Sequence, residues 1–202
     1  MPGKFITFEG VDGAGKSTHV EWFANELRSA GHAVLVTREP GGSQLAETLR
    51  ELVLHEPMDA VTETLIVFAA RDDHLKKHIL PALTAGTWVV SDRFTDATVA
   101  YQGGGKGVQP SLIEALRQVV HPNLMPDCTL VFDCPYEVSR ERMSNSGRAL
   151  DRFEREGQAF FRRVRAAYLA TAKAEPGRVR IIDSTQPLEA IRADLQSLLA
   201  AL

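Results

Sequence analysis

The segment from Gly10 to Ser17 reads Gly-Val-Asp-Gly-Ala-Gly-Lys-Ser and carries the residue types and spacing of a phosphate-binding loop. Its glycines let backbone N–H groups turn toward an anion, and the N-terminus of a following helix adds partial positive charge. Lys16 is then expected to reach the β- and γ-phosphates of a nucleotide, and the Ser17 hydroxyl to bind Mg²⁺. The pattern therefore predicts a nucleoside triphosphate site.

Such a loop requires a strand that leads into it and a helix that leaves it. The apolar run Phe5–Phe8 comes directly before the loop, and residues 16–30 place apolar side chains at helical spacing. Both flanking elements are thus predicted. This context distinguishes the segment from a glycine-rich turn that matches the pattern by chance.

Composition limits the class of protein. The chain has 202 residues, 44% of them hydrophobic, which suits a single globular domain over 1–202. A net charge of −3 gives no sign of a nucleic-acid partner, and two cysteines, Cys128 and Cys134, exclude a disulfide framework and are expected to be buried thiols. We find no secretory leader and no apolar run near the ~20 residues that span a bilayer, so we expect no membrane association and a cytoplasmic location.

Short apolar runs rich in β-branched residues alternate with segments of helical periodicity. The runs predict strands buried on both faces of a parallel sheet: Phe5–Phe8, Ala33–Thr37, Thr87–Ser91, Thr129–Asp133 and Val179–Ile182. Helices are predicted at 16–30, 44–54, 60–84, 111–120, 136–144, 153–174 and 187–201, with Pro81 kinking or ending the third. The alternation indicates an α/β fold, a three-layer α/β/α sandwich with a five-stranded parallel sheet, and the phosphate loop makes it a P-loop NTPase fold.

Charged residues follow the predicted strands, where parallel sheets bind their ligands. Arg38 and Arg93 are the important pair, because an arginine offers planar, bidentate donors to a phosphate. Asp92 is placed to hold a water in the shell of a Mg²⁺ ion. His74 and His78 lie four residues apart, but without a third ligand in sight we interpret them as exposed surface histidines rather than a metal site.

Four segments resemble the thymidylate kinase family, in order along residues 4 to about 190. They are Phe8–Thr18, Thr37–Ser43, the triplet Asp92-Arg93-Phe94 and Thr98–Gly105. The phosphate loop by itself is generic, whereas the three later motifs together are specific. The resemblance implies a fold similar to that of nucleoside monophosphate kinases. It also implies that the protein transfers a phosphoryl group from ATP to thymidine 5′-monophosphate with the help of Mg²⁺. Its partners would be small-molecule nucleotides, and it would form a homodimer. It places the whole loop at ATP: Gly10, Val11, Asp12, Gly13, Ala14, Gly15, Lys16, Ser17 and Thr18.

The resemblance also implies an acceptor-phosphate site. Asp12 would meet the deoxyribose 3′-hydroxyl, and Arg93, with Arg38 and Arg50 as weaker candidates, would hold the acceptor phosphate. Tyr101 would crowd the 2′ position and disfavour ribonucleotides.

A second implied set reads the base. Arg71 would hydrogen-bond the thymine ring, and Thr98 and Gln102 would complete the recognition. Many members stack thymine on a phenylalanine four residues before this arginine; here Val67 holds that place, and Phe68 either takes over the stacking or packs in the core.

The family also uses an arginine to cover the transferring phosphoryl group. Some members carry it inside the phosphate loop, at the position of Gly13, so its absence implies that a lid at about 143–153 supplies it. Arg148 is the first choice, with Arg152 and Arg142 behind it, and Arg142 is also expected at the ATP site.

Three hypotheses remain open from the sequence. The first is a thymidylate kinase, the second a related kinase for another nucleotide or a nucleoside, and the third a nucleotide-binding switch without metabolic turnover. The absence of an Asn-Lys-x-Asp segment of GTPase type counts against the third. Oligomeric state does not follow from the residues, because the apolar stripe of Leu65, Val67, Phe68, Leu75 and Ile79 fits either a core or an interface.

Overall fold

Five parallel strands form one sheet at the centre of the molecule. The computed structural model describes residues 3–145, 151–200 and 202, and its strands run in the order β2-β3-β1-β4-β5. Their bounds are β1 (Phe5–Gly10), β2 (Val34–Arg38), β3 (Trp88–Asp92), β4 (Cys128–Asp133) and β5 (Val179–Asp183). The predicted α/β fold with a five-stranded parallel sheet is confirmed.

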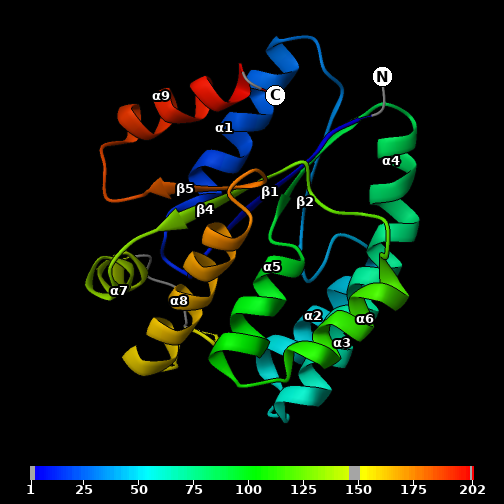
Figure 1. Cartoon of the computed structure of the whole chain (residues 1–202), viewed down its shortest axis with the longest axis vertical. Helices are drawn as coiled ribbons and strands as arrows, with labels where there is room; N and C mark the ends of the chain where they lie inside the picture. The colour runs from blue at the N-terminus through cyan, green and yellow to red at the C-terminus, as the bar shows by residue number, and fades with distance from the viewer. Residues whose placement is uncertain (1–2, 146–150, 201) are drawn as a thin grey trace.

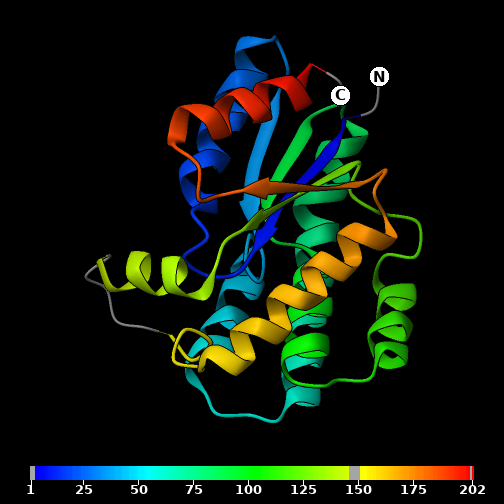
Figure 2. The ribbon, with the colours of Figure 1, turned by 60° about the vertical axis from the view of Figure 1, so that its left-hand side comes forward.

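Helices cover both faces of this sheet and make the outer two layers. Helices α1 and α9 lie on one face, and α8 with the α5–η2 segment lies on the other (Figures 1 and 2). No helix among the described residues is long and apolar enough to cross a membrane. The helical bounds are α1 (Lys16–Ser29), α2 (Gln44–His55), α3 (Ala60–His74), η1 (Leu75–Ile79), α4 (Leu80–Thr84), α5 (Thr95–Thr98), η2 (Val99–Gly105), α6 (Pro110–Val120), α7 (Tyr136–Asn145), α8 (Gln158–Ala174) and α9 (Leu188–Leu199).

The central strand β1 positions the phosphate loop because it is fixed on both faces. All six of its residues are buried. Phe8 packs edge-on against Phe23 of α1, with ring centroids 5.4 Å apart, while Phe5 on the opposite face meets Phe94 at 4.8 Å. Such edge-to-face aromatic pairs add to the free energy of burial. The loop therefore starts from a fully buried strand that is packed on both faces.

The edge strands differ from the prediction that all strands are buried on both faces. β2 is only half-buried, and in β5 Ile181 is 51% exposed. The cysteines follow the prediction, since Cys128 and Cys134 are both buried free thiols.

Helix α8 also starts later than the predicted 153–174. The Asp151 carboxylate accepts hydrogen bonds from the N–H groups of Phe153 and Glu154, which closes a turn, and the helix begins only after Gly157. An Asx-type turn of this kind competes with the helix for the same backbone donors.

Pro81 does not end the helix predicted over 60–84. Residues 60–84 form one helical run in which η1 is a π-helical turn, and the N–H of Leu80 bonds to the carbonyl of Leu75. The wider turn lies directly before the proline, whose ring would clash with the carbonyl four residues back in an α-helix. A second π-helical segment, η2, continues α5 through most of the segment Thr98–Gly105.

Candidate active site

The phosphate loop and the start of α1 form one wall of a cavity of about 700 Å³ at the carboxyl ends of the strands. Helix α1 begins after Gly15 without a capping side chain, and its first turn carries no acidic residue. The free N–H groups of this turn and the helix dipole are therefore available to an anion. Among the predicted site residues, the cavity is lined by Asp12, Gly13, Ala14, Gly15, Lys16, Ser17, Thr18, Arg38, Arg50, Asp92, Arg93 and Arg142.

Lys16 is folded back onto the loop. Its buried ammonium group donates to the carbonyl oxygens of Gly10 and Val11, at 3.2 and 3.1 Å. Burial and the nearby Arg93 lower the pKa of Lys16. Binding of an anionic phosphate at this position would relieve both penalties, so the amine is set to favour a negatively charged ligand.

Arg93 connects the phosphate loop to the strand end of β3. Its guanidinium donates to the carboxylate of Asp12 at 2.6 Å and to the carbonyl of Gly10 at 2.8 Å. The hydroxyl oxygens of Tyr101 and Tyr168 accept two further bonds, both at 3.1 Å. The backbone of Arg93 lies at φ +76°, a left-handed conformation that side chains other than glycine rarely adopt and that is found at functional sites.

Asp12 is ionised by its neighbours although its side chain is only 30% exposed. Burial opposes ionisation, but Arg93, Lys16 and the hydroxyl of Tyr101, which donates to the carboxylate at 2.8 Å, outweigh it and lower the pKa of Asp12. The site thus holds a carboxylate within hydrogen-bond distance of the same arginine that can meet a phosphate.

A second, narrower cavity of about 80 Å³ adjoins the first. The two cavities share five charged residues: Asp12, Glu39, Arg50, Arg93 and Asp151. The narrower one is further lined by the predicted residues Arg71, Thr98, Tyr101 and Gln102. Donor-side and acceptor-side residues predicted from separate motifs therefore meet at Arg93.

Arg71 is the most buried of the arginines in this cavity, at 1% exposure. Its Nε donates to Glu39 at 2.7 Å, and its Nη2 donates to the carbonyl of Phe94 and the hydroxyl of Thr98. The remaining nitrogen, Nη1, is buried and has no hydrogen-bond partner among the described residues. A buried donor without a partner costs free energy, which a ligand acceptor would recover.

Four predicted site residues do not line these two cavities. Gly10 contributes its carbonyl to Arg93, and Val11 lies in the core beside a smaller cavity. Phe68 is buried in a cluster with Val108 and Ile113, with its ring 4.7 Å from the Arg71 guanidinium. Arg152 bonds the carbonyl of Val53 and pairs with Glu63 instead. Arg148 lies outside the described residues.

Position 13, occupied by Gly13, has no room for the arginine that some thymidylate kinases carry in this loop. Its backbone lies at φ +74°, and a Cβ atom there would be 2.5 Å from the carbonyl oxygen of Ser139 on α7. The hydroxyl of Ser139 also donates to the carbonyl of Asp12 at 2.7 Å. Packing of α7 on the loop thus excludes any side chain at position 13 in this conformation.

Sequence reasoning missed several residues that line the site. Glu39 borders both cavities, and Phe153 lines the acceptor side, edge-on to Tyr101 with centroids 5.7 Å apart. Asp151 also borders both, and burial raises its pKa. The place of Glu39 directly after a strand was a usable signal, whereas Phe153 carried none because its position depends on the turn at Asp151.

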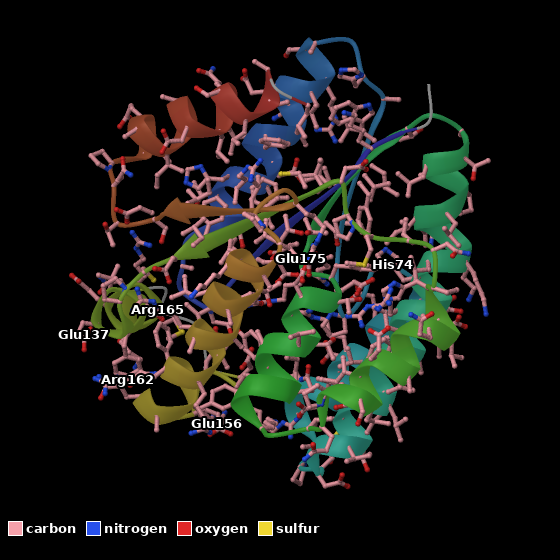
Figure 3. The ribbon with its side chains drawn as sticks, viewed as in Figure 1. His74, Glu137, Glu156, Arg162, Arg165 and Glu175 are labelled. Carbon is pink, nitrogen blue, oxygen red and sulfur yellow. The ribbon has the colours of Figure 1, made fainter. Side chains whose placement is uncertain are left out.

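The interpretation of His74 as an exposed histidine is wrong. Its side chain is fully buried between α3 and the loop after β2, in contact with Glu39 and Thr37 (labelled in Figure 3). Among the described residues no group of three His, Cys, Asp or Glu side chains could hold a metal ion.

A buried carboxyl, that of Glu9, lies behind Arg93 and lines neither cavity. Glu9 accepts hydrogen bonds from the N–H of Phe94 and the hydroxyl of Tyr168, both at 2.7 Å. Burial and the charge of Asp96 raise the pKa of Glu9 to about 8, although Arg93 opposes them. Glu9 is therefore protonated in most folded molecules at neutral pH.

A glycine-rich phosphate loop on a parallel sheet, with a donor cavity and an acceptor cavity that meet at one arginine, defines a P-loop nucleotide kinase. A family model described as thymidylate kinase matches residues 8–195. The chain is 58% identical over 195 residues to the thymidylate kinase of Bordetella pertussis, covering 96% of this chain and 93% of that one. It is 57% identical over 199 residues to the thymidylate kinase of Thiobacillus denitrificans, covering 98% and 97%.

Solved structures agree with the sequences. The crystal structure of thymidylate kinase from Ehrlichia chaffeensis superimposes with a TM-score of 0.80 at 32% identity, covering 99% of each chain. The chain belongs to the thymidylate kinase family, and its family resemblance is confirmed.

The raised pKa of Glu9 makes stability depend on pH. Between pH 4.5 and 8 the unfolded chain loses this proton and the folded chain retains it, so stability falls as pH rises, by at most about 1.4 kcal/mol per pH unit. Glu9→Gln removes the proton and keeps the shape of the neutral acid. We would measure the free energy of unfolding in urea at pH 5.5, 6.5 and 7.5. The difference between the variant and the wild type should shift in favour of the variant at each higher pH. If the free energies of the two proteins change with pH in the same way, the protonated state of Glu9 is contradicted.

Proposed function

We propose that this chain transfers the γ-phosphoryl group of ATP to thymidine 5′-monophosphate, giving ADP and thymidine 5′-diphosphate. The observation that carries the proposal is the meeting of the two cavities at Arg93 and Asp12, with the phosphate loop on one side and Arg71 on the other. The printed name of the relatives, thymidylate kinase, supports the same acceptor.

On the donor side, the loop from Gly10 to Thr18 would hold the triphosphate. Its N–H groups and Lys16 would neutralise the β- and γ-phosphates, and Arg142, which donates to the carbonyls of Ala14 and Ser184, would border the nucleotide. The first N–H groups of α1 are available to the phosphates because no side chain caps this end of the helix.

The same cavity fits a magnesium ion bound together with the phosphates. Asp92 ends β3 with one carboxylate oxygen, Oδ1, buried and without a partner among the described residues, and Ser17 lines the same cavity with an exposed side chain. Hard oxygen ligands of this kind suit Mg²⁺, which keeps several waters and shares the phosphates. When bound, the ion would supply positive charge to the phosphoryl oxygens, with Ser17 and Asp92 as its protein-side holders.

On the acceptor side, Arg93 would hold the monophosphate, assisted by Arg50 and by Arg38. Arg50 lines both cavities, while Arg38 is exposed and paired with Glu47 at 2.9 Å, which makes it the weaker candidate. Asp12 would accept a hydrogen bond from the 3′-hydroxyl, and the Tyr101 ring beside it would occupy the space of a 2′-hydroxyl.

The base would lie along Arg71, Thr98 and Gln102. The unpartnered Nη1 of Arg71 is the donor for a thymine carbonyl, and the amide of Gln102 is held by Glu63 at 2.8 Å. Phe68 would act on the base only through Arg71, which lies over its ring. A site built to pair such groups rejects acceptors that leave them unpaired.

Phosphoryl transfer needs no covalent intermediate with the protein, because its transition state is loose and responds to positioning and charge. Arg93 would align the acceptor oxygen for in-line attack. The lid around residues 143–153 would add the covering arginine, since Gly13 has no space for one. We favour Arg148, because Arg152 is already bound to Val53 and Glu63.

We further propose a single catalytic domain that works as a homodimer in the cytoplasm. Helices α2 and α3 expose large apolar side chains, among them Leu45 (48%), Val61 (46%) and Leu65 (47%), which would cover one another in a dimer. By contrast Val67, Phe68, Leu75 and Ile79 of the predicted stripe are buried within this chain. A molar mass by light scattering equal to one chain, 22.2 kDa, would contradict the dimer.

The activity is tested by coupled ADP release with a panel of acceptors. We expect ATP and thymidine 5′-monophosphate to give the fastest turnover, ahead of other deoxynucleoside and ribonucleoside monophosphates and of free nucleosides. Preferred turnover of a different acceptor would replace thymidylate as the substrate, and ADP release independent of any acceptor would favour the switch hypothesis.

The lid arginine is tested by comparing two substitutions. Arg148→Ala should lower kcat by roughly 10³-fold or more with little change in the acceptor KM, because the contact exists mainly in the transition state. Arg152→Ala breaks the contacts with Val53 and Glu63. It should lower the melting temperature and leave kcat close to the wild-type value. The reverse pattern would assign the covering role to Arg152.

A further inference from the structure

A buried carboxylate, Glu39, lies where β2 ends and borders both cavities. Only 2% of its side chain is exposed. One oxygen accepts a hydrogen bond from Nε of Arg71 at 2.7 Å, and the other meets Nδ1 of His74 at 3.3 Å. A buried carboxylate is stable only when it is paired and hydrogen-bonded, and Glu39 meets both conditions.

The contacts of Arg71 leave it one donor group for a ligand. Nε is bound by Glu39, and Nη2 is bound by the carbonyl of Phe94 and the hydroxyl of Thr98. Only Nη1 lacks a partner among the described residues, although it is buried. Among the described residues Glu39 is the one carboxylate that holds the guanidinium, and together with Phe94 and Thr98 it fixes the direction in which Nη1 points.

His74 fixes Glu39 from the opposite side. Its Nε2 lies 2.7 Å from the hydroxyl of Thr37, and since the ionised Glu39 can only accept, Nδ1 carries a proton and donates it to Glu39. A Cβ atom on Gly42, whose φ is +84°, would be 2.2 Å from Nε2 of His74. The ring is therefore packed closely against the loop backbone and is fully buried.

The charge on Glu39 is maintained by its partners. Burial works against ionisation, but Arg71 and the hydrogen bond with His74 outweigh it, and the pKa of Glu39 is lowered. Charge-assisted hydrogen bonds are the stronger and more directional kind. The row Thr37–His74–Glu39–Arg71 thus connects strand β2 to helix α3 and then to the acceptor cavity.

We propose that Glu39, supported by His74 and Thr37, is a positioning residue that orients Arg71 so that its Nη1 alone faces the base of the acceptor. The inference rests on the proposed function, because it gives Glu39 the role of orienting Arg71, the arginine proposed to bind the base. Glu39 itself does not touch the reacting atoms. Glu39 therefore affects the binding of the acceptor. This binding stabilises the substrate complex and the transition state equally, so its loss raises the acceptor KM and leaves kcat unchanged.

Glu39→Gln keeps the shape and removes the charge. We expect the KM for thymidine 5′-monophosphate to rise by about tenfold or more, while kcat and the KM for ATP stay within about threefold. A merely structural defect would instead lower kcat through loss of active protein and leave the acceptor KM unchanged. The matched control is Asp72→Asn. Asp72 follows Arg71 on α3, and its carboxylate pairs with Lys76 on the surface.

A double-mutant cycle shows whether Glu39 acts through Arg71. In an Arg71→Met background, adding Glu39→Gln should change the acceptor KM by less than about twofold, because the group that it orients is gone. An equal tenfold rise in both backgrounds overturns the proposal. If circular dichroism shows that Glu39→Gln is unfolded, Thr37→Val gives the same test, with an expected rise of about two- to fivefold, and an unchanged KM overturns the proposal.

The wild type separates this inference from the function beneath it. Failure of the wild-type protein to turn over thymidine 5′-monophosphate contradicts the proposed function and this inference together. Wild-type turnover combined with an unchanged acceptor KM in folded Glu39→Gln overturns the inference alone.

Discussion

The ion pair between Arg93 and Asp12 is the interaction on which the arrangement of the site depends. It joins the end of β3 to the phosphate loop at 2.6 Å, and the same guanidinium bonds the carbonyl of Gly10. Arg93 reaches both because its backbone adopts φ +76°, an unfavourable conformation that the surrounding contacts must maintain. Tyr101 and Tyr168 complete the set of acceptors around the guanidinium, so the donor and acceptor cavities share a rigid wall.

Buried charge in this site is held in position by partners of opposite sign or by protonation. Asp12 and Glu39 stay ionised because arginines face them, whereas Glu9, with a neighbouring carboxylate and no direct cation, has a pKa of about 8. Lys16 donates to the backbone carbonyls of Gly10 and Val11, and the Nη1 of Arg71 has no hydrogen-bond partner among the described residues. The protein thus compensates its own charges almost completely and leaves donors where a nucleotide would supply acceptors.

Local patterns in the sequence predicted the sheet and the phosphate loop, because glycine spacing and apolar runs act through neighbouring residues. The family resemblance, rather than these patterns, implied the residues of the acceptor cavity. The failures depend on contacts between distant segments. His74 is buried by a loop thirty-odd positions earlier in the chain, and Arg152 is bound by Val53 and Glu63 rather than facing the cavity. The π-helical turns before Pro81 and after Thr98 likewise follow from packing, since ordinary helical periodicity does not announce them.

The central claim is that one arginine, Arg93, joins acceptor binding to phosphoryl transfer while the donor site stands on the phosphate loop. Arg93→Lys keeps the charge and removes the planar fork. Calorimetric titration of this variant should give an ATP dissociation constant within about threefold of the wild type, together with thymidine 5′-monophosphate binding and kcat both reduced by roughly 100-fold or more. Acceptor binding and kcat close to the wild-type values, or an equal loss of affinity for both nucleotides, would contradict this account.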